Sequence, residues 1–249
     1  MVKKNIKCKG KIYVENSGSI PLVIIQTYSL KTQIPKKIFD NIKRFAPEFE
    51  HLIFDDRDCI RFLYEYYDDN YVKFFSSFPQ GAHKADFFRY CYLYKLGGCY
   101  LDIKTELIRP LFQLIANKNE LITVLSEHSI KSIYQGILCS PPNILIFNTL
   151  IQEMIRISKN KIPHDYLYFT RHFYKTLSNF LNKSDLQIGQ NKNEKNSNNT
   201  SSYLFKEYCT RNPADCYDGL DKYGFCCFVL DVENKKCFKT RNSDFGKSW

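Results

Sequence analysis

Two pairs of charged residues lie in a largely apolar segment, and their side chains could bind a polar ligand. The segment is ADFFRYCYLYKLGGCYLDIK, residues 85–104, and the pairs are Asp86 with Arg89 and Asp102 with Lys104. Carboxylates accept hydrogen bonds from hydroxyl groups or bind metal ions, and a lysine ammonium serves as a point charge for phosphate. The alternative explanation is an ordinary ion pair on a helix and an exposed pair on a strand.

The pairs are predicted to lie on a helix and on the strand that follows it. A helix of about three turns from Lys84 would end at Gly97-Gly98, because glycine supplies the left-handed C-terminal cap. Asp86 and Arg89 are three residues apart, so they share one face of this helix and can pair. In an α/β sheet, polar groups at the carboxyl end of a strand face the ligand crevice, so Asp102 is a candidate ligand-binding residue. Alternation places three residues of the strand on the core face (Cys99, Leu101, Ile103) and three on the polar face (Tyr100, Asp102, Lys104).

Strand-like and helix-like segments alternate along the chain, which indicates an α/β sheet. A chain of 249 residues, 44% of them hydrophobic, can form the substantial core of one such domain. Residues 71–78 are predicted to be an aromatic-rich connection, and the polar stretch 182–202 a disordered loop before the closing strands. The remaining predicted strands cover residues 22–27, 51–54, 121–125 and 133–139, and the remaining helices residues 35–45, 58–67, 110–115 and 144–157.

The net charge of +10 favours anionic partners but does not choose among nucleotides, phosphoglycans, nucleic acid and membrane surfaces. Because lysines are scattered from Lys3 to Lys247 rather than clustered, we expect no nucleic-acid partner, although a basic nucleic-acid-binding protein is one alternative. No apolar run approaches the roughly 20 residues that span a bilayer, so we expect no transmembrane segment and at most peripheral membrane contact.

The ten cysteines are predicted to be reduced thiols in a cytoplasmic protein. The start of the chain lacks the apolar region of a secretory signal, and disulfides are rare in the cytosol. No two cysteines have C-x-x-C spacing, and no two of the five histidines lie four residues apart, so a zinc site is not expected.

Several motifs, in order, resemble the sugar-nucleotide-binding region of glycosyltransferase family 32. The block A-D-x-x-R-Y…L-Y-K-x-G-G-x-Y-L-D within residues 85–102 carries most of the likeness. Similarity extends to IPLVIIQTY at 20–28, FAPEFEHLIFDDRD at 45–58, FPQGAHKA at 78–85 and the final GKSW. The chain is also similar, more distantly, to the catalytic domain of the clostridial glucosylating toxins.

The resemblance implies a GT-A type nucleotide-sugar-binding fold, with a Rossmann-like mixed sheet flanked by helices. Residues 1–249 would form a single glycosyltransferase domain. About residues 20–140 would bind the nucleotide sugar, and residues 141–249 would form the acceptor and closing part. Acceptor specificity is expected in that second part, where the likeness is weak.

The resemblance also implies transfer of a hexose or N-acetylhexosamine from a UDP- or GDP-sugar to a hydroxyl group of a glycan or glycoprotein. Anomeric configuration would be retained. No motif nominates the carboxylate nucleophile that a double displacement requires, so a front-face mechanism is favoured, in which the leaving phosphate accepts the proton of the acceptor. A catalytically inactive scaffold with this fold is the other alternative.

Roles for individual residues also follow from the resemblance. Asp86 would bind the donor ribose, Arg89 the sugar or phosphate, and Asp102 ribose, sugar and any metal. Tyr100 would lie beside the donor sugar. The nucleotide base would contact Gln26, Thr27 and Tyr28, and the diphosphate would be covered by Ser248 and Trp249.

Two departures from the family pattern concern the metal. The D-x-D motif is here Asp102-Ile103-Lys104, and the closing H-H-x-x-G-S-W is SDFGKSW, so both histidines are missing. In one hypothesis Lys104 supplies part of the positive charge that Mn²⁺ or Mg²⁺ would otherwise bring, and Asp102 and Lys104 are the catalytic residues. In another, Asp102 and Asp244 bind the metal. A third possibility is that Asp102 and Lys104 only neutralise each other.

Overall fold

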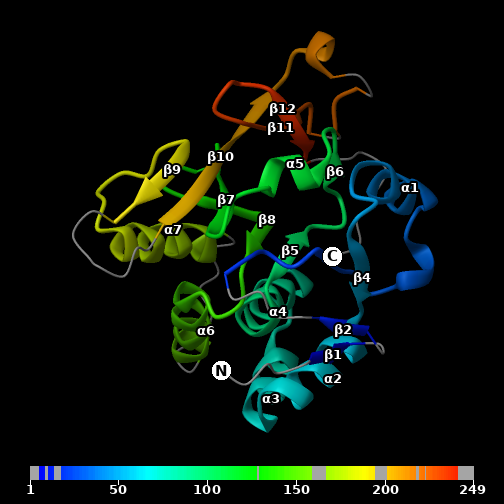
Figure 1. Ribbon diagram of the computed structural model, residues 1–249, viewed down its shortest axis with the longest axis vertical. Helices are drawn as coiled ribbons and strands as arrows, with labels where there is room; N and C mark the ends of the chain where they lie inside the picture. Colours follow the sequence, from blue (N-terminus) through cyan, green and yellow to red (C-terminus); the bar gives the residue numbers. More distant parts are fainter. Residues whose placement is uncertain are drawn as a thin grey trace.

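A mixed β-sheet forms the centre of the computed structural model (Figure 1). The structure describes residues 6–8, 11–13, 18–127, 129–158, 167–193, 201–216, 219–221 and 223–240. The strand order is β4-β3-β5-β8-β7-β10-β11-β12-β6, with β9 paired to β10. The strands are β3 Val23–Thr27, β4 Glu50–Phe54, β5 Gly98–Leu101, β6 Glu106–Leu107, β7 Leu121–Leu125, β8 Ile133–Ser140, β9 Gly189–Lys192, β10 Ser201–Thr210, β11 Cys226–Leu230 and β12 Lys236–Lys239. A separate antiparallel pair comprises β1 Ile6–Cys8 and β2 Lys11–Tyr13.

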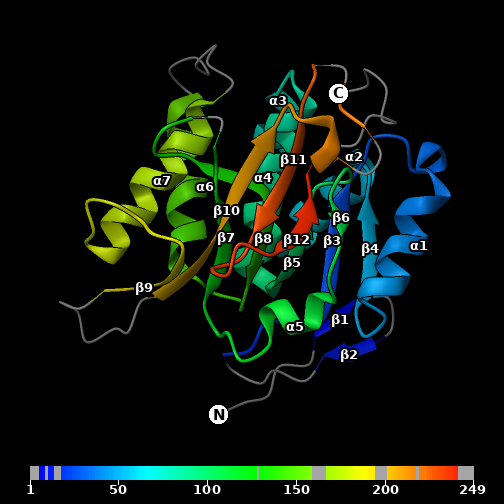
Figure 2. The ribbon, with the colours of Figure 1, turned by 90° about the horizontal axis from the view of Figure 1, so that it is seen from above.

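Six strands of the sheet end at the same side, which we call the carboxyl edge. Strand β3 is parallel to β4 and β5, and β8 is antiparallel to both β5 and β7. Strand β10 is parallel to β7. Strand β11 is antiparallel to both β10 and β12, so β12 is parallel to β10. The carboxyl ends of β3, β4, β5, β7, β10 and β12 therefore lie at one edge, together with the beginning of β8 (Figure 2). Ligands of open α/β sheets bind at such an edge.

Helices cover both faces of the sheet and bury two apolar clusters. The larger cluster lies under α2 Asp56–Tyr66, α3 Asp69–Ser77, α4 Gly81–Leu96, α6 Leu145–Ser158 and α7 Tyr168–Leu181. The smaller cluster lies between the opposite face and helices α1 Lys36–Phe45 and α5 Leu111–Ile115. The short helices η1 Lys31–Gln33 and η2 Pro213–Asp215 complete the elements. The predicted α/β class, with a mixed sheet flanked by helices, is confirmed.

Helix α4 is apolar on nearly every side and is buried accordingly, as predicted. It ends at Gly97, with φ +66°, and β5 begins at Gly98, with φ +108°. A Cβ atom at Gly97 would lie 2.7 Å from the Pro142 nitrogen, and one at Gly98 would lie 2.9 Å from the Val23 carbonyl oxygen. The double glycine is therefore required both by the positive φ angles and by the close approach of neighbouring backbone.

Three predictions of local structure are wrong. Residues 71–78 mostly form α3, because the Asp68 side chain accepts hydrogen bonds from the first backbone N–H groups and the aromatic side chains pack on α4. The expected loop 182–202 contains β9 and the first residues of β10, which pair antiparallel; residues 194–200 lie outside the described residues. The strand expected at 99–104 ends at Leu101, and a turn follows in which Thr105 N–H donates to the Asp102 carbonyl.

The expectation of reduced thiols is also wrong for four cysteines. Cys209 is bonded to Cys227, and Cys216 to Cys226. Both disulfides tie the end of β10 and the segment after it to the start of β11. Within the part of the chain that the structure describes, no helix has the length and apolar character needed to cross a membrane.

Candidate functional site

The Arg89 guanidinium joins helix α4 to the carboxyl edge of the sheet. Arg89 is 4% exposed, and its Nη2 lies 3.3 Å from the carboxylates of both Asp86 and Asp102. Its Nε donates to the Ala85 carbonyl at 3.1 Å and its Nη1 to the Gln135 carbonyl at 2.5 Å. The predicted pair between Asp86 and Arg89 is confirmed, and the second pair brings Asp102 to the same cation.

Exposure distinguishes the members of this trio. The side chain of Asp102 is 28% exposed and that of Asp86 16%, whereas that of Arg89 is 5% exposed. A buried charge is tolerated when it is paired and fully hydrogen-bonded. The two carboxylates can therefore meet a ligand, while the contacts of Arg89 serve to hold them in place.

Burial and charge shift the pKa values of the trio in defined directions. Burial raises the pKa of Asp86 to about 6, although Arg89 opposes this change; the Asp102 charge adds to it. Burial lowers the pKa of Arg89, but Tyr100 and the two carboxylates outweigh burial and leave it above its ordinary value. Arg89 is therefore a permanent cation, and Asp86 is mainly ionised at neutral pH.

Tyr100 fixes the orientation of the Asp102 carboxylate. The Tyr100 hydroxyl donates to Asp102 Oδ1 at 3.1 Å, so the Thr27 hydroxyl donates to the Tyr100 oxygen at 3.0 Å. The Arg89 guanidinium lies 4.2 Å from the centre of the Tyr100 ring, a cation–π contact. Three of the predicted nucleotide-sugar-binding residues thus form a chain from β3 through β5 to Asp102.

Gln26 and His51 support the backbone of Asp102. Gln26 is fully buried; its Nε2 donates to the Asp102 carbonyl at 3.2 Å, and its Oε1 lies 2.7 Å from His51 Nε2. Because Gln26 Oε1 can only accept, His51 Nε2 carries the proton. Burial lowers the pKa of His51 to about 4, so its ring is neutral at physiological pH. Sequence reasoning did not identify His51; a glutamine inside an apolar strand was the available signal that a polar partner existed.

A bulge in β8 brings Tyr134 to Asp102. The register between β7 and β8 shifts between Ile122 and Val124, and the Gly136 carbonyl in the bulge accepts the Asp102 N–H at 2.8 Å. A Cβ atom at Gly136 would overlap the Tyr134 hydroxyl and lie 2.8 Å from Asp102 Oδ2. Gly136 is therefore needed for close packing, and neither it nor Tyr134 was nominated from the sequence.

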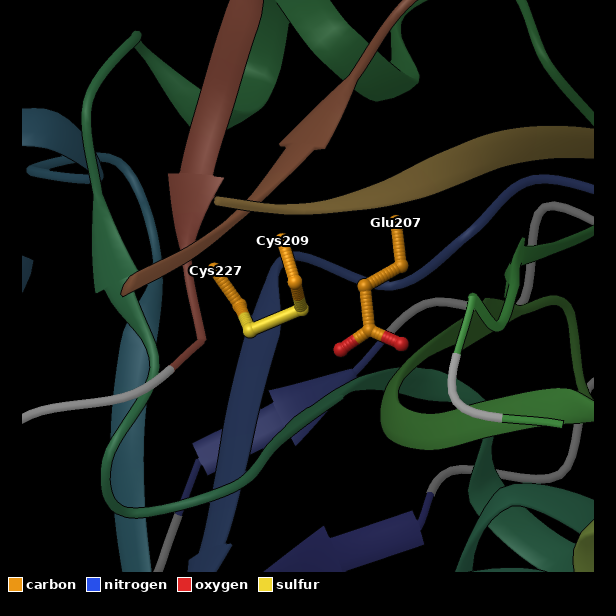
Figure 3. Close-up of side chains that lie close together, drawn as sticks. All are labelled: Glu207, Cys209 and Cys227. Atoms are coloured by element: carbon orange, nitrogen blue, oxygen red, sulfur yellow. A yellow bond between two sulfur atoms is a disulfide. The ribbon is translucent and has the colours of Figure 1, made fainter. Parts of the chain in front are cut away.

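Glu207, on β10, contributes a further carboxylate to the carboxyl edge. It is 1% exposed and accepts hydrogen bonds from the Ser126 hydroxyl at 2.8 Å and the Glu127 N–H at 3.2 Å. Figure 3 shows its carboxylate beside the disulfide between Cys209 and Cys227. No motif in the sequence marked Glu207, because β10 lies outside the segments that resemble the family.

The other nominated residues fall into two groups. Tyr28 is buried in a small cluster with Ile34, Ile38 and Ile103, and Lys104 is half-buried in the turn after Asp102. Asp244, Ser248 and Trp249 lie outside the described residues. Thr240 N–H donates to the Cys227 carbonyl, so β12 brings the chain to the carboxyl edge immediately before residue 241.

The described residues at the D-x-D position do not suit a divalent metal. Mn²⁺ and Mg²⁺ take oxygen ligands. Asp102 offers one carboxylate, and Lys104 offers none. The cluster of three potential ligands found within the described residues is Glu207, Cys209 and Cys227, whose sulfurs form a disulfide. The described residues therefore do not form the two-carboxylate site of a D-x-D motif.

A mixed α/β fold with acidic groups at the carboxyl edge of its sheet is a common setting for ligand binding. The fold by itself does not identify the function. The family described as "Glycosyltransferase sugar-binding region containing DXD motif" matches residues 33–122, which include α4 and Asp102. The resemblance to DXD glycosyltransferases of family 32 is thus confirmed.

Individual relatives agree with the family match. The chain is 32% identical over 108 residues to inositol phosphoceramide mannosyltransferase 3 of Schizosaccharomyces pombe, covering 42% of this chain and 30% of that protein. It is 31% identical over 78 residues to the initiation-specific alpha-1,6-mannosyltransferase of Candida albicans, covering 30% of this chain and 20% of that protein. The matches thus span less than a third of the length of these curated relatives.

A solved structure, the PaToxG glycosyltransferase, has a TM-score of 0.44 and 13% identity, over 65% of this chain and 70% of that one.

Proposed function

We propose that this chain is a glycosyltransferase that binds a nucleotide sugar at the carboxyl edge of its sheet. The observation that carries the proposal is the buried trio of Asp86, Arg89 and Asp102, which lies within the region matched by the DXD family. Such a trio is not expected for stability alone, because apolar residues often replace buried ion pairs without loss. Its two partly exposed carboxylates suit the hydroxyl groups of ribose and sugar.

Each group has a distinct role in this proposal. Asp86 accepts hydrogen bonds from the donor ribose, and Asp102 contacts ribose and sugar. Arg89 holds both carboxylates, with Tyr100 aligning Asp102. Thr27 and Gln26 set the position of these groups from β3, and Tyr28 lies near the nucleotide base. Ser248 and Trp249 cover the diphosphate.

Sugar transfer separates charge, and the residues of the site suit that separation. As the anomeric bond breaks, negative charge grows on the phosphate and positive charge on the sugar ring. We propose that the ammonium of Lys104 stabilises the phosphate in place of part of the usual metal charge. Asp102 with Asp244 as a metal site is the competing arrangement. A front-face reaction with retention of configuration suits a site in which no nucleophile is nominated.

A donor screen tests the proposal. Binding of UDP and GDP, and hydrolysis of UDP-glucose, UDP-galactose, UDP-N-acetylglucosamine and GDP-mannose, are measured with Mn²⁺ and with a chelator. We expect thermal stabilisation by UDP or GDP, none by ATP, and hydrolysis of one sugar nucleotide. Because the names of both relatives specify mannosyl transfer, GDP-mannose is the first donor to test. If no donor is hydrolysed although a nucleotide binds, the chain is an inactive scaffold.

The metal dependence of that hydrolysis separates the two arrangements at Asp102. Hydrolysis that persists with the chelator supports the role of Lys104. Loss of hydrolysis on chelation, with recovery on adding Mn²⁺, supports a metal site and refutes the lysine proposal. Lys104→Asp restores the D-x-D sequence and is expected to make turnover more dependent on Mn²⁺.

Three further parts of the proposal concern organisation, acceptor and compartment. Residues 1–249 act as one transferase domain, and the part after residue 140 selects a hydroxyl group of a glycan or glycoprotein.

Two disulfides favour an oxidising compartment over the cytoplasm predicted from the sequence. Mass spectrometry of the protein isolated under alkylating, non-reducing conditions would test this; free Cys209 and Cys216 would restore the cytoplasmic prediction.

A further inference from the structure

The sequence contains three N-x-S/T triplets, which begin at Asn182, Asn198 and Asn199. Such a triplet is the acceptor of an N-linked glycan when it lies on the surface of a secreted protein. Asn198 and Asn199 lie outside the described residues. The triplet Asn182-Lys183-Ser184 is described completely, so its surroundings show whether a glycan fits there.

Asn182 caps the carboxyl end of helix α7 in the left-handed conformation, with φ 51° and ψ 44°. Its backbone N–H donates to the Asn179 carbonyl at 3.1 Å. Asparagine adopts this conformation more readily than most residues, so helix capping alone accounts for Asn182. Capping does not account for a serine two residues later. The two explanations therefore differ at Ser184, which only a glycan acceptor requires.

The side-chain amide of Asn182 is not used by the fold. Asn182 and Ser184 are exposed, and within the part of the chain that the structure describes the Asn182 side chain forms no hydrogen bond or ion pair. The turn is held instead by Lys183, whose N–H donates to the Ser178 carbonyl at 3.0 Å and whose carbonyl accepts from the Ser178 hydroxyl. A glycan on Asn182 Nδ2 therefore breaks no contact among the described residues.

The surface around the triplet is charged and hydrated. Lys131 pairs with Asp185 at 2.9 Å, and these side chains are 56% and 64% exposed. The chain returns to the core at Leu186, which is buried and whose N–H donates to the Tyr174 hydroxyl at 2.9 Å. Residues 182–185 thus form a short surface loop, where a bulky polar group meets solvent rather than the core.

The disulfides and the triplet indicate the same compartment. The bonds Cys209–Cys227 and Cys216–Cys226 require an oxidising compartment, and N-linked glycans are acquired on the secretory route, whose lumen is oxidising. The disulfides lie at β10 and β11, whereas the triplet follows α7, so neither feature is a structural consequence of the other.

We propose that Asn182 is an N-glycosylation site; this inference rests on the proposed oxidising compartment and not on the transferase activity. Asn182 Nδ2 bonds to the anomeric carbon of an oligosaccharide carried on a lipid diphosphate. The bond between that carbon and the diphosphate oxygen breaks, and its electron pair leaves with the lipid diphosphate, which takes up the amide proton. The chain is the acceptor in this step, and its own donor site takes no part.

Peptide mapping of the full chain, isolated from the cells that produce it, tests the inference. A peptide N-glycosidase acting in water labelled with heavy oxygen converts each glycosylated asparagine into a labelled aspartate. Asn117 is the matched control, because it is also exposed and left-handed, with φ 61°, but has Asn119 where the triplet needs serine or threonine. Label at Asn117 therefore measures spontaneous deamidation.

Two variants at Ser184, produced in the same cells, separate the triplet from the helix cap. Ser184→Ala removes the triplet and Ser184→Thr keeps it, while Asn182 itself is unchanged in both. We expect label at residue 182 at least about tenfold above that at Asn117 in the wild type and in Ser184→Thr, and at background in Ser184→Ala. The Cys209–Cys227 bond, mapped without reduction in each sample, shows that the protein is folded and has met an oxidising compartment.

Three results would overturn the inference. Unlabelled Asn182 in a protein with intact disulfides leaves Asn182 as a helix cap only. Label that persists in Ser184→Ala does not come from the triplet. Free Cys209 and Cys227 overturn the oxidising compartment together with the glycan. None of these results affects the donor screen, so the proposed transferase activity is judged separately.

Discussion

Charged side chains are buried to different degrees at the two edges of the sheet. At the amino edge, Glu120 and its partners Ser201 and Gln190 form a hydrogen-bonded group close to water. At the carboxyl edge, Arg89 and Glu207 are almost completely buried. Hydrogen bonds of Glu120 and of Glu207 link β7 to β10 at the two edges, so the pairing of these strands does not require a buried charge. The difference fits the proposal that the carboxyl edge binds the donor, because strand pairing alone does not account for the buried charge there.

Removing the Arg89 cation should have the largest effect of any single change at the carboxyl edge. Arg89→Met leaves Asp86 and Asp102 near one another without their shared partner. Loss of one member of a buried ion pair lowers the free energy of unfolding by about 3 to 5 kcal/mol. Urea denaturation measures this loss, and we expect donor turnover to vanish as well.

An exposed ion pair supplies the control for Arg89. Lys36 pairs with Asp40 on the surface of α1 at 2.6 Å. Lys36→Met should change the free energy of unfolding by less than about 0.5 kcal/mol. Equal losses in the two variants would mean that the buried trio has no special weight in the fold.

Asp102→Asn should give the next largest effect, on turnover rather than on folding. The amide keeps the size of the side chain but removes the charge that faces Arg89 and the substrate. We expect kcat for donor hydrolysis to fall about 100- to 1000-fold. Glu120→Gln, at the amino edge, should stay within about twofold. Full activity of Asp102→Asn would contradict the assignment of the site to this edge.

Only part of this edge could be predicted from the sequence. The helix with Asp86 and Arg89, the double glycine and the strand before Asp102 follow from local spacing, and the structure has all of them. The contacts of Arg89 with Asp102, of Gln26 with His51, and of Glu207 with Ser126 join residues 13 to 81 positions apart. Such contacts depend on strand order and register, which local patterns do not determine. The disulfides were missed for the same reason, because cysteine spacing does not specify pairing.

Asp86 should make donor binding depend on pH. Its pKa is raised to about 6, mainly by burial, so its ionised form is lost as the pH falls below about 6. At pH 5 the affinity for UDP or GDP should be about tenfold weaker than at pH 7, because only about a tenth of Asp86 is then ionised. Calorimetric titration between pH 5 and 8 measures this, and Asp86→Asn should bind weakly with little pH dependence over that range.

Protein stability should respond to Asp86 in the opposite sense. Because its pKa is higher in the folded protein than in the unfolded chain, folded Asp86 holds its proton over a wider pH range. Its contribution to stability is therefore complete below about pH 4 and is lost as the pH rises through about 6. Asp86→Asn should remove this component from the stability–pH curve. A curve identical to that of the wild type would show that Asp86 is not desolvated in solution.

His51 should give the smallest effect, because it acts on Asp102 only through Gln26. In His51→Phe the buried Gln26 Oε1 loses its donor, which costs about 1 to 3 kcal/mol of unfolding free energy, and the amide holds the Asp102 carbonyl less firmly. We expect kcat to fall about fivefold. His51→Gln can still donate and should recover most of the loss. The control is His172→Phe on α7, where the ring stacks on Tyr168 and its Nε2 lies 3.9 Å from Glu153 Oε1. If both histidine variants lower kcat equally, Gln26 does not transmit the effect, and Asp102 is positioned by its other contacts, among them those with Arg89 and Tyr100.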